Sequence, residues 1–248
     1  MLGLYHERWV LSMPIPIYLA MTGAEFLTCT QLPTRLGWMA CHFSPSGEGL
    51  CNFPAQLPPN SLLILDDSTP YQDHGCDVIL SQLSDAVTKL HPAALLLDFQ
   101  RPDHDGLRTL TERIVSTLSC PVVVSSCYAD TLDCPIFLPP EPLWQPLPEY
   151  LEPYRNREIW LDAAPICAQV LVDKDTSHYL PLSYTTCDAC PHYDDTLHCR
   201  YHIKIEQEQI VFSLCRSCAE LASWLAEAEA LGVKGAVGLF QELRDFSS

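Results

Sequence analysis

The segment from Ala93 to Pro102 constrains the fold more than any other part of the chain. It is an apolar run of strand length that ends abruptly in Asp98, Gln100 and Arg101. A strand of a parallel sheet is buried on both faces, so its apolar run is continuous and its polar residues come at the carboxyl end. In α/β folds that end of the sheet is where ligands bind. The segment therefore predicts a buried parallel strand that leads into a ligand site.

Short β-rich runs recur along the whole chain, and most of them close on polar residues or proline. A (β/α)8 barrel needs eight such strands and usually has about 250 residues, and this chain has 248. We therefore predict an α/β fold, a single and somewhat irregular (β/α)8 TIM-type barrel formed by residues 1–248. The predicted strands are Ile15–Met21, Gly37–Phe43, Ser61–Asp67, Ala93–Phe99, Pro121–Cys127, Pro135–Leu138, Arg157–Ala163 and Gly235–Gln241.

A doubly wound open sheet is the alternative fold. The chain contains no Gly-x-Gly-x-x-Gly fingerprint and no Walker A loop, which disfavours the nucleotide-binding versions of that sheet.

Helical periodicity predicts helices over Asp77–Leu90, Leu107–Leu118 and Cys218–Leu231. We expect Asp77 to be the N-cap of the first helix, which would bury Val78, Leu80, Leu83 and Val87 on one face. The third helix ends at Gly232, a residue that is typical of the position after a helix.

Residues 168–216 interrupt the alternation of strands and helices. Within them, His198–Glu206 and Gln209–Leu214 have the alternating pattern of a half-exposed antiparallel hairpin. We therefore predict a Cys-rich hairpin insertion before the last helix and strand. We also expect the proline-dense segment Leu138–Pro153 to be a rigid surface loop over the barrel mouth.

Acidic residues follow several predicted strands and would meet at the carboxyl end of the barrel. Hydrolysis of a glycosidic bond commonly needs two carboxylates that flank the bond, one of them kept protonated. For each single acid the alternative is a structural role, as a helix cap or as the partner of Arg101 or Arg157. For the set as a whole we expect a ligand-binding role. The acids are Asp66, Asp67, Asp98, Glu141, Asp162 and Glu242.

The fourth predicted strand resembles the catalytic strand of the family-eighteen, chitinase-like glycoside hydrolases. That family has a (β/α)8 barrel and the signature Asp-x-x-Asp-x-Asp-x-Glu, often followed by an aromatic residue and a proline. Asp98 matches the last Asp of the signature, and Phe99 and Pro102 match the aromatic residue and the proline. Gln100 occupies the position of the Glu, and Leu96 stands where an earlier Asp belongs.

The resemblance implies a carbohydrate or small-molecule ligand at the barrel mouth. In the family the Glu protonates the glycosidic oxygen, while the Asp before it steadies the acetamido group of the substrate, which acts as the nucleophile. An amide cannot donate a proton at a useful pKa, so Gln100 would block this route. The chain is then either a hydrolase that uses other carboxylates or a binding relative that has lost its acid.

We expect Asp98 to be the electrostatic stabiliser, and Glu242, Asp162 or Asp66 to be the acid or base. Aromatic residues near strand ends are either sugar platforms or ordinary core residues, and these are Trp38, Tyr71, Trp144, Trp160 and Phe240. The candidate substrate-binding residues are Gln100, Arg101, Asp67, Tyr128, Trp160 and Gln241.

The chain has 13 cysteines, and most of them are expected to be reduced and buried. Cys187, Cys190, Cys215 and Cys218 form two Cys-x-x-Cys pairs around the predicted hairpin, an arrangement that resembles a treble-clef zinc site. Four thiolates can surround one zinc ion, and a helix N-terminus stabilises them. There are two alternatives to a zinc site: the cysteines are reduced thiols that bind no metal, or they carry out redox chemistry. No cofactor is expected to be required, and a structural zinc ion is the one considered.

Composition restricts the partners. The formal net charge is −17 with 14 Lys and Arg residues, which argues against nucleic acid. No stretch reaches the roughly 18 consecutive apolar residues of a membrane helix, and residues 1–20 lack the pattern of a secretory signal. We therefore expect a cytoplasmic protein without a membrane partner. A second hypothesis is a non-enzymatic interaction protein that binds through the 168–216 ribbon, with or without zinc.

Overall fold

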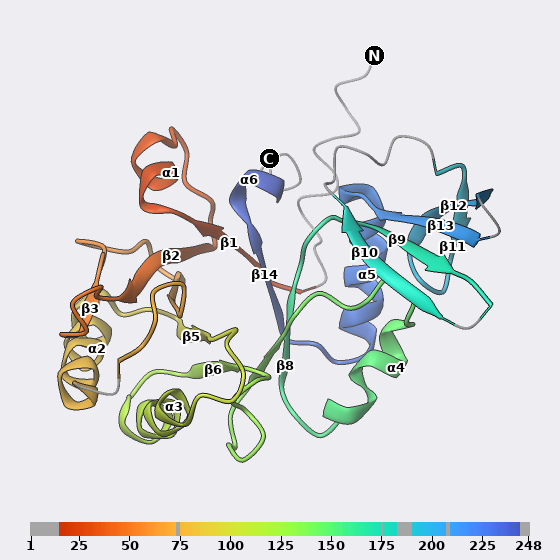
Figure 1. The fold of residues 1–248 in the computed structure, drawn as a ribbon. Coiled ribbons are helices and arrows are strands. Elements are labelled where there is room, and N and C mark those ends of the chain that lie inside the picture. The colour runs from red at the N-terminus through yellow and green to blue at the C-terminus, as the bar shows by residue number, and fades with distance from the viewer. Residues whose placement is uncertain (1–14, 73–74, 175, 183–189, 207–208, 244–248) are drawn as a thin grey trace.

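A closed barrel of eight parallel strands forms the centre of the computed structural model (Figure 1), which describes residues 15–72, 75–174, 176–182, 190–206 and 209–243. Each barrel strand pairs with the next one around the ring. The first strand pairs with both the second and the last strand of the barrel, and this closes the ring. Every predicted strand is confirmed. The barrel strands are β1 (Ile17–Met21), β2 (Leu36–Phe43), β4 (Leu62–Asp66), β5 (Ala94–Asp98), β6 (Val122–Ser125), β7 (Ile136–Leu138), β8 (Ile159–Asp162) and β14 (Gly235–Leu239).

The strands are apolar on both faces because the barrel buries both. Successive side chains of a strand point to opposite sides. Leu62 and Ile64 of β4 fill the interior of the barrel together with Leu96 of β5. Leu63 and Leu65 point outward and belong to the core shared with the surrounding helices. This explains the continuous apolar runs in the sequence. A short strand, β3 (Leu50–Cys51), extends β2 in the antiparallel sense.

The three predicted helices are confirmed as α2 (Cys76–Leu90), α3 (Asp105–Thr117) and α5 (Cys218–Ala230). The predicted N-cap of α2 is wrong, since Gly75 holds that position with a φ of 99° and Asp77 pairs with Arg113 at 2.6 Å. Val78 is 46% exposed, and Ile79 is buried in its place. Gly232 follows α5 with a φ of 90°, as the sequence predicts. The short helices are α1 (Gly23–Thr28), α4 (Leu147–Leu151), the 3-10 turn η2 (Glu152–Tyr154) and α6 (Phe240–Leu243).

An antiparallel sheet is inserted between β8 and α5 and lies beside the barrel (Figure 1). Its order is β10-β9-β13-β12-β11, so the predicted hairpin is present as β12 and β13 but has three further strands around it. The inserted strands are β9 (Ile166–Val172), β10 (Ser177–Leu182), β11 (His192–Asp194), β12 (Cys199–Glu206) and β13 (Gln209–Arg216).

The proline-dense segment after β7 is not the surface loop that its composition predicts. It contains α4 and η2, and Glu141, Leu143, Leu147 and Leu151 in it are buried. Proline has a fixed φ that suits the first turn of a helix, and both short helices carry a proline there. The prolines therefore start helices in this segment.

Two sequence-based expectations can be compared with the described residues directly. Among the described cysteines, Cys41, Cys167, Cys199 and Cys215 are buried and the others are half-buried, so the prediction that most cysteines are buried holds only in part. In the described part of the chain, no helix has the length and apolar character needed to cross a membrane.

Candidate active site at the barrel mouth

Three strand-end carboxylates point into the carboxyl end of the barrel. Asp66, Asp98 and Asp162 are the last residues of β4, β5 and β8, each two positions after an interior residue and therefore on the same face of its strand. Asp66 and Asp98 are direct register partners on neighbouring strands, which places their Cα atoms about 4.8 Å apart. The sequence prediction that strand-end acids gather at this mouth is correct for these three residues.

The Asp98 carboxylate is paired with an amide. The side-chain Nε2 of Gln100 donates a hydrogen bond to Oδ1 of Asp98. Burial raises the pKa of Asp98 above its usual value, the Gln100 hydrogen bond lowers it, and the negative charges of Asp66 and Asp67 raise it further. Gln100 and Asp98 thus face one another at the position where the resemblance implies the acid and the stabiliser.

Asp162 has the most strongly perturbed carboxyl at the mouth. Burial, followed by the charges of Asp98 and Glu242, raises its pKa to about 7. Within the described residues its carboxyl has no hydrogen bond or ion pair. The sequence analysis missed Tyr150 of α4, whose phenol has a pKa that burial raises, with a smaller contribution from the charge of Asp162. The Tyr150 hydroxyl donates to the carbonyl of Pro139 at 2.8 Å. No sequence motif identifies Tyr150.

Glu242 and Gln241 follow β14 in the short helix α6, and both residues are exposed. Desolvation raises the pKa of the Glu242 carboxyl. Its charge acts on Asp162, which places it at the same end of the barrel. Glu242 is therefore one of the acids at the mouth, as the sequence analysis expects.

Two predicted substrate-binding residues support the loop that carries Gln100. Asp67 is 4% exposed, and its carboxylate accepts hydrogen bonds from the backbone N–H groups of Gln100 and Arg101, both at 3.0 Å. Tyr128 is 1% exposed, and its hydroxyl donates to the carbonyl of Arg101. The Arg101 side chain is exposed and donates to the carbonyl of Ser68 at 3.2 Å. Asp67 and Tyr128 thus position Gln100 and Arg101.

Trp160 lies in the core of the barrel. It belongs to the interior cluster, stacks on Tyr18 with ring centroids 5.5 Å apart, and donates its indole N–H to Glu158 at 3.1 Å. Trp38 and Tyr71 are buried as well, and Phe240 is half-buried. Trp144 is 50% exposed and makes an edge contact with Tyr179 of β10. Of the aromatic residues considered as platforms, Trp144 is therefore the one with a largely exposed ring.

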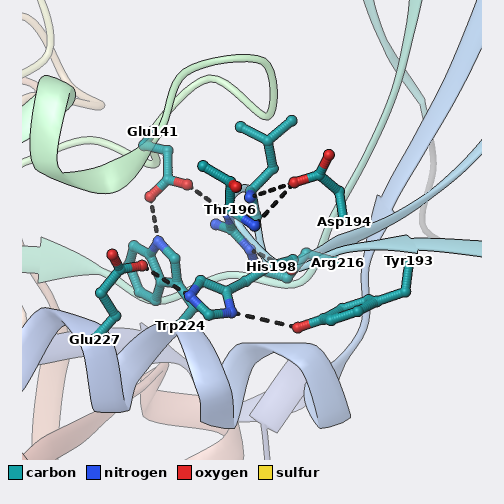
Figure 2. Close-up of polar contacts among 9 residues, drawn as sticks. Glu141, Tyr193, Asp194, Thr196, His198, Arg216, Trp224 and Glu227 are labelled. Atoms are coloured by element: carbon teal, nitrogen blue, oxygen red, sulfur yellow. Dashed lines mark hydrogen bonds and ion pairs between the residues drawn. The ribbon is translucent and has the colours of Figure 1, made fainter.

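Glu141 has a structural role (Figure 2). It is 2% exposed, and its carboxylate accepts hydrogen bonds from the Arg216 guanidinium and the Trp224 indole. Arg216, at the end of β13, also donates to the carbonyl of Leu197 at 2.8 Å, while His198 pairs with Glu227 of α5 at 2.7 Å. The expectation that Glu141 is a mouth acid is wrong, because this network uses it to hold the inserted sheet against the barrel.

The predicted zinc ligands are only partly described. Cys187 lies outside the described residues. The Cys190 thiol donates to the carbonyl of Ser213 at 3.5 Å. Cys215 is disulfide-bonded, but not to Cys167, whose Sγ lies 3.4 Å from the Cys215 Sγ in a hydrogen-bond contact. Cys218 packs against the barrel core, its Sγ 3.6 Å from the carbonyl oxygen of Glu242. Among the residues that the structure describes, no group of three or more His, Cys, Asp or Glu side chains could hold a metal ion.

Comparison with known proteins gives the fold. No family model and no curated protein matches the sequence. Among solved structures, the spore cortex-lytic enzyme SleL of Bacillus cereus matches with a TM-score of 0.56 and 8% identity over 93% of this chain and 73% of that one. SleL of Bacillus megaterium QM B1551 matches with a TM-score of 0.52 and 10% identity over 90% and 70%. The barrel has the fold of chitinase-type glycoside hydrolases.

A third structure supports the same conclusion. It is a mutant of a GH18 chitinase from Cycas revoluta in complex with a tetramer of N-acetylglucosamine, with a TM-score of 0.53 and 8% identity over 90% of this chain and 94% of that one. The resemblance that residues 95–102 carry is thereby confirmed at the level of the fold. The fourth barrel strand of this chitinase-type barrel is β5, which presents Asp98 and Gln100.

Proposed function

We propose that the mouth of this chitinase-type barrel binds an oligosaccharide and that the usual route of hydrolysis is lost. The observation that carries the proposal is the hydrogen bond from Gln100 to Asp98 at the end of β5. It joins the residue that matches the family stabiliser to an amide that stands in place of the acid. The amide can donate hydrogen bonds to a ligand but cannot give up a proton.

Asp162 is the carboxyl best suited to any remaining acid–base chemistry. Its pKa of about 7 lets it hold or release a proton near neutral pH. In that role Asp98 would stabilise developing positive charge. The negative charge of Asp66 would then help to raise the pKa of Asp98, and the charge of Glu242 would help to raise the pKa of Asp162.

The choice of ligand class rests on the fold and on the polar character of the mouth. One structure of the same fold holds an N-acetylglucosamine tetramer. Exposed polar groups at this end of the barrel are the amides of Gln100 and Gln241 and the guanidinium of Arg101. Such groups can hydrogen-bond to sugar hydroxyls and to the carbonyl of an acetamido group.

Calorimetric titration with a tetramer of N-acetylglucosamine tests this proposal. We expect binding by the wild type and a loss of at least about tenfold in affinity in Asp98→Ala, since about 1.4 kcal/mol corresponds to tenfold. Glu152→Ala, which removes an exposed acid of η2, is the control and should bind as the wild type does. Binding that is unchanged in both Asp98→Ala and Asp162→Asn would show that the mouth is not the site.

One observation favours a non-enzymatic interaction protein as the second candidate function. Ile203, Ile205 and Ile210 on the inserted sheet are 47%, 80% and 40% exposed, and Ile205 and Ile210 are register partners. Exposed apolar side chains that adjoin one another are typical of contact surfaces. A partner that binds the wild type and is lost in Ile205→Ser would support this function, while equal binding by the variant would contradict it.

The structural zinc ion stays a prediction. Metal analysis of the purified, reduced protein tests it, and a zinc content far below one ion per chain would contradict it.

A further inference from the structure

A thiol lies against a disulfide in the inserted sheet. Cys215 of β13 is disulfide-bonded, and Cys167 of β9 is not part of that disulfide. The thiol of Cys167 donates a hydrogen bond to the Sγ of Cys215, and the two sulfur atoms are 3.4 Å apart. Heavy atoms at this separation are in contact. A nucleophile and a disulfide are thus already together, as exchange between them requires.

The sheet holds these two sulfur atoms in register. Cys167 and Cys215 are directly opposite one another in the antiparallel pair of β9 and β13. Opposite residues in such a pair have Cα atoms about 4.5–5.5 Å apart, and a disulfide joins Cα atoms that are about 4.4–6.8 Å apart. A disulfide between Cys167 and Cys215 therefore fits the sheet without a change of register.

Burial separates this pair from dissolved reactants. Cys167 is 3% exposed and Cys215 is 6% exposed. The rate of thiol–disulfide exchange depends on access to the sulfur that is attacked. A small oxidant or reductant in solution has little access to Cys215, while the Cys167 thiol is in contact with it. Reaction inside the protein is therefore favoured over reaction with an external thiol.

Two other cysteines of this region are placed differently. The Cys190 thiol donates to the carbonyl of Ser213 at 3.5 Å. Cys199 of β12 is buried in the cluster that contains Leu214, on the opposite face of the sheet from Cys215. Cys167 is therefore the thiol that the sheet register assigns to the disulfide.

We propose that the Cys167 thiolate attacks the sulfur of Cys215 and exchanges the disulfide. A sulfur–sulfur bond forms between Cys167 and Cys215, and the bond between Cys215 and its present partner breaks. The electron pair of the broken bond goes to that partner, which leaves as a thiolate and takes up the proton that Cys167 lost. One disulfide is present before and after the step, so the step needs neither an oxidant nor a reductant.

The exchange moves the covalent link to the place where the inserted sheet joins the barrel. β9 is the first strand after the barrel strand β8. Cys215 is followed directly by Arg216, which forms the buried pair with Glu141. The new disulfide joins the first strand of the insert to the strand that carries this pair, and it closes residues 167–215 into one loop. This inference does not depend on the proposed carbohydrate site.

The time scale of the test follows from the state of the Cys167 thiol. Burial, followed by the charge of Cys190, raises the pKa of this thiol to about 11. The thiolate is the nucleophile and is scarce at neutral pH, so the exchange is slow there. The reaction is therefore followed for hours at pH 8.5.

Peptide mapping of the wild type by mass spectrometry measures the exchange. Protein purified without reductant is incubated in the absence of oxygen and with a chelator, and samples are then acidified to stop the reaction, alkylated and digested. We expect linked peptides that contain Cys167 and Cys215 to appear while the initial linkage of Cys215 decreases by the same amount. The number of alkylated thiols per chain should stay constant, because exchange conserves it.

Two variants locate the nucleophile. Cys167→Ala should abolish the change of linkage, and Cys199→Ala, which removes a buried cysteine from the other face of the sheet, should retain it. The inference is wrong if Cys215 of the wild type keeps its initial linkage throughout, becomes linked to Cys190, or is a thiol from the start. A loss of two thiols per chain would indicate oxidation and would overturn it as well. The wild type alone gives these outcomes, so the test does not depend on the folding of a variant.

Discussion

The side-chain amide of Gln100 donates a hydrogen bond to the carboxylate of Asp98, and the backbone N–H of Gln100 is held by Asp67 at 3.0 Å. Asp67 is buried, and the neighbouring carbonyl of Arg101 accepts a hydrogen bond from Tyr128. Gln100 is therefore fixed at both its backbone and its side chain. The mouth of the barrel keeps a well-positioned hydrogen-bond donor at the place where the motif resemblance implies an acid.

Removal of the Gln100 amide should raise the pKa of Asp98. The hydrogen bond favours the ionised carboxylate, so its loss in Gln100→Ala leaves burial and the charges of Asp66 and Asp67 unopposed. Titration of the Asp98 carboxyl carbon by NMR measures this change. Gln241→Ala removes another exposed amide at the same end of the barrel and should leave the titration unchanged. An unchanged or lower pKa in Gln100→Ala would be inconsistent with the hydrogen bond.

Asp162→Asn should become stabilising relative to the wild type as the pH rises. The pKa of Asp162 is about 7 in the fold, against an ordinary value of 3.8, so the folded protein binds this proton more tightly than the unfolded chain. Stability from this group is therefore fully present below pH ~4 and is lost as the pH rises through 7. The asparagine cannot ionise. We expect its free energy of unfolding in urea, relative to the wild type, to increase by about 2 kcal/mol between pH 5 and pH 8.5. A constant difference across this range would contradict the raised pKa.

The ion pair of Glu141 and Arg216 should be strongly coupled to stability. Glu141→Leu leaves the Arg216 guanidinium, which is 1% exposed, without its carboxylate, and the Trp224 indole without its acceptor. Breaking a buried pair in this way costs about 3–5 kcal/mol. Glu152→Ala breaks the exposed pair with Arg155 and should cost less than about 1 kcal/mol. If urea unfolding gives a similar decrease in the free energy of unfolding for the two variants, the buried network does not hold the inserted sheet against the barrel.

Gly235 keeps room for the indole of Trp160 inside the barrel. A Cβ atom at Gly235 would lie 2.8 Å from the Trp160 ring, closer than real contacts allow. We expect Gly235→Ala to destabilise the fold by about 1–3 kcal/mol because the core is overpacked. Gly23→Ala is the control, since its Cβ would meet Trp38 at an ordinary 3.6 Å. A neutral Gly235→Ala would argue that Trp160 is free to move, as a ligand platform could be.

The sequence predicts the barrel well because a buried parallel strand has a simple local pattern. The apolar runs that end in Asp66, Asp98 and Asp162 correspond to β4, β5 and β8, and the acids lie at the mouth as expected. The fold of the solved structures agrees with the motif around Asp98 and Gln100. The strands, the strand-end acids and the motif each depend on a few residues that are neighbours in the chain. They can therefore be predicted from one sequence.

The errors concern contacts between residues far apart in the chain. Glu141 follows a strand like the mouth acids do, but Arg216, 75 residues later, withdraws it into a buried pair. Trp160 is close to a strand end, yet its side chain points inward onto Tyr18. Asp77 has the side chain of a good N-cap, but it pairs with Arg113, 36 residues later, and Gly75 holds the cap position. No local pattern reports these partners.

The central claim is that Gln100 stands in the place of the catalytic acid, and turnover by Gln100→Glu tests it most directly. A correctly placed general acid contributes about 10²–10⁴-fold to such a reaction. The glutamate variant should therefore hydrolyse a chromogenic N-acetylglucosamine oligosaccharide at least about a hundredfold faster than the wild type, and the gain should disappear when Asp98→Ala is added. If Gln100→Glu is folded and binds the oligosaccharide but hydrolyses it no faster than the wild type does, the proposed role of this position is wrong.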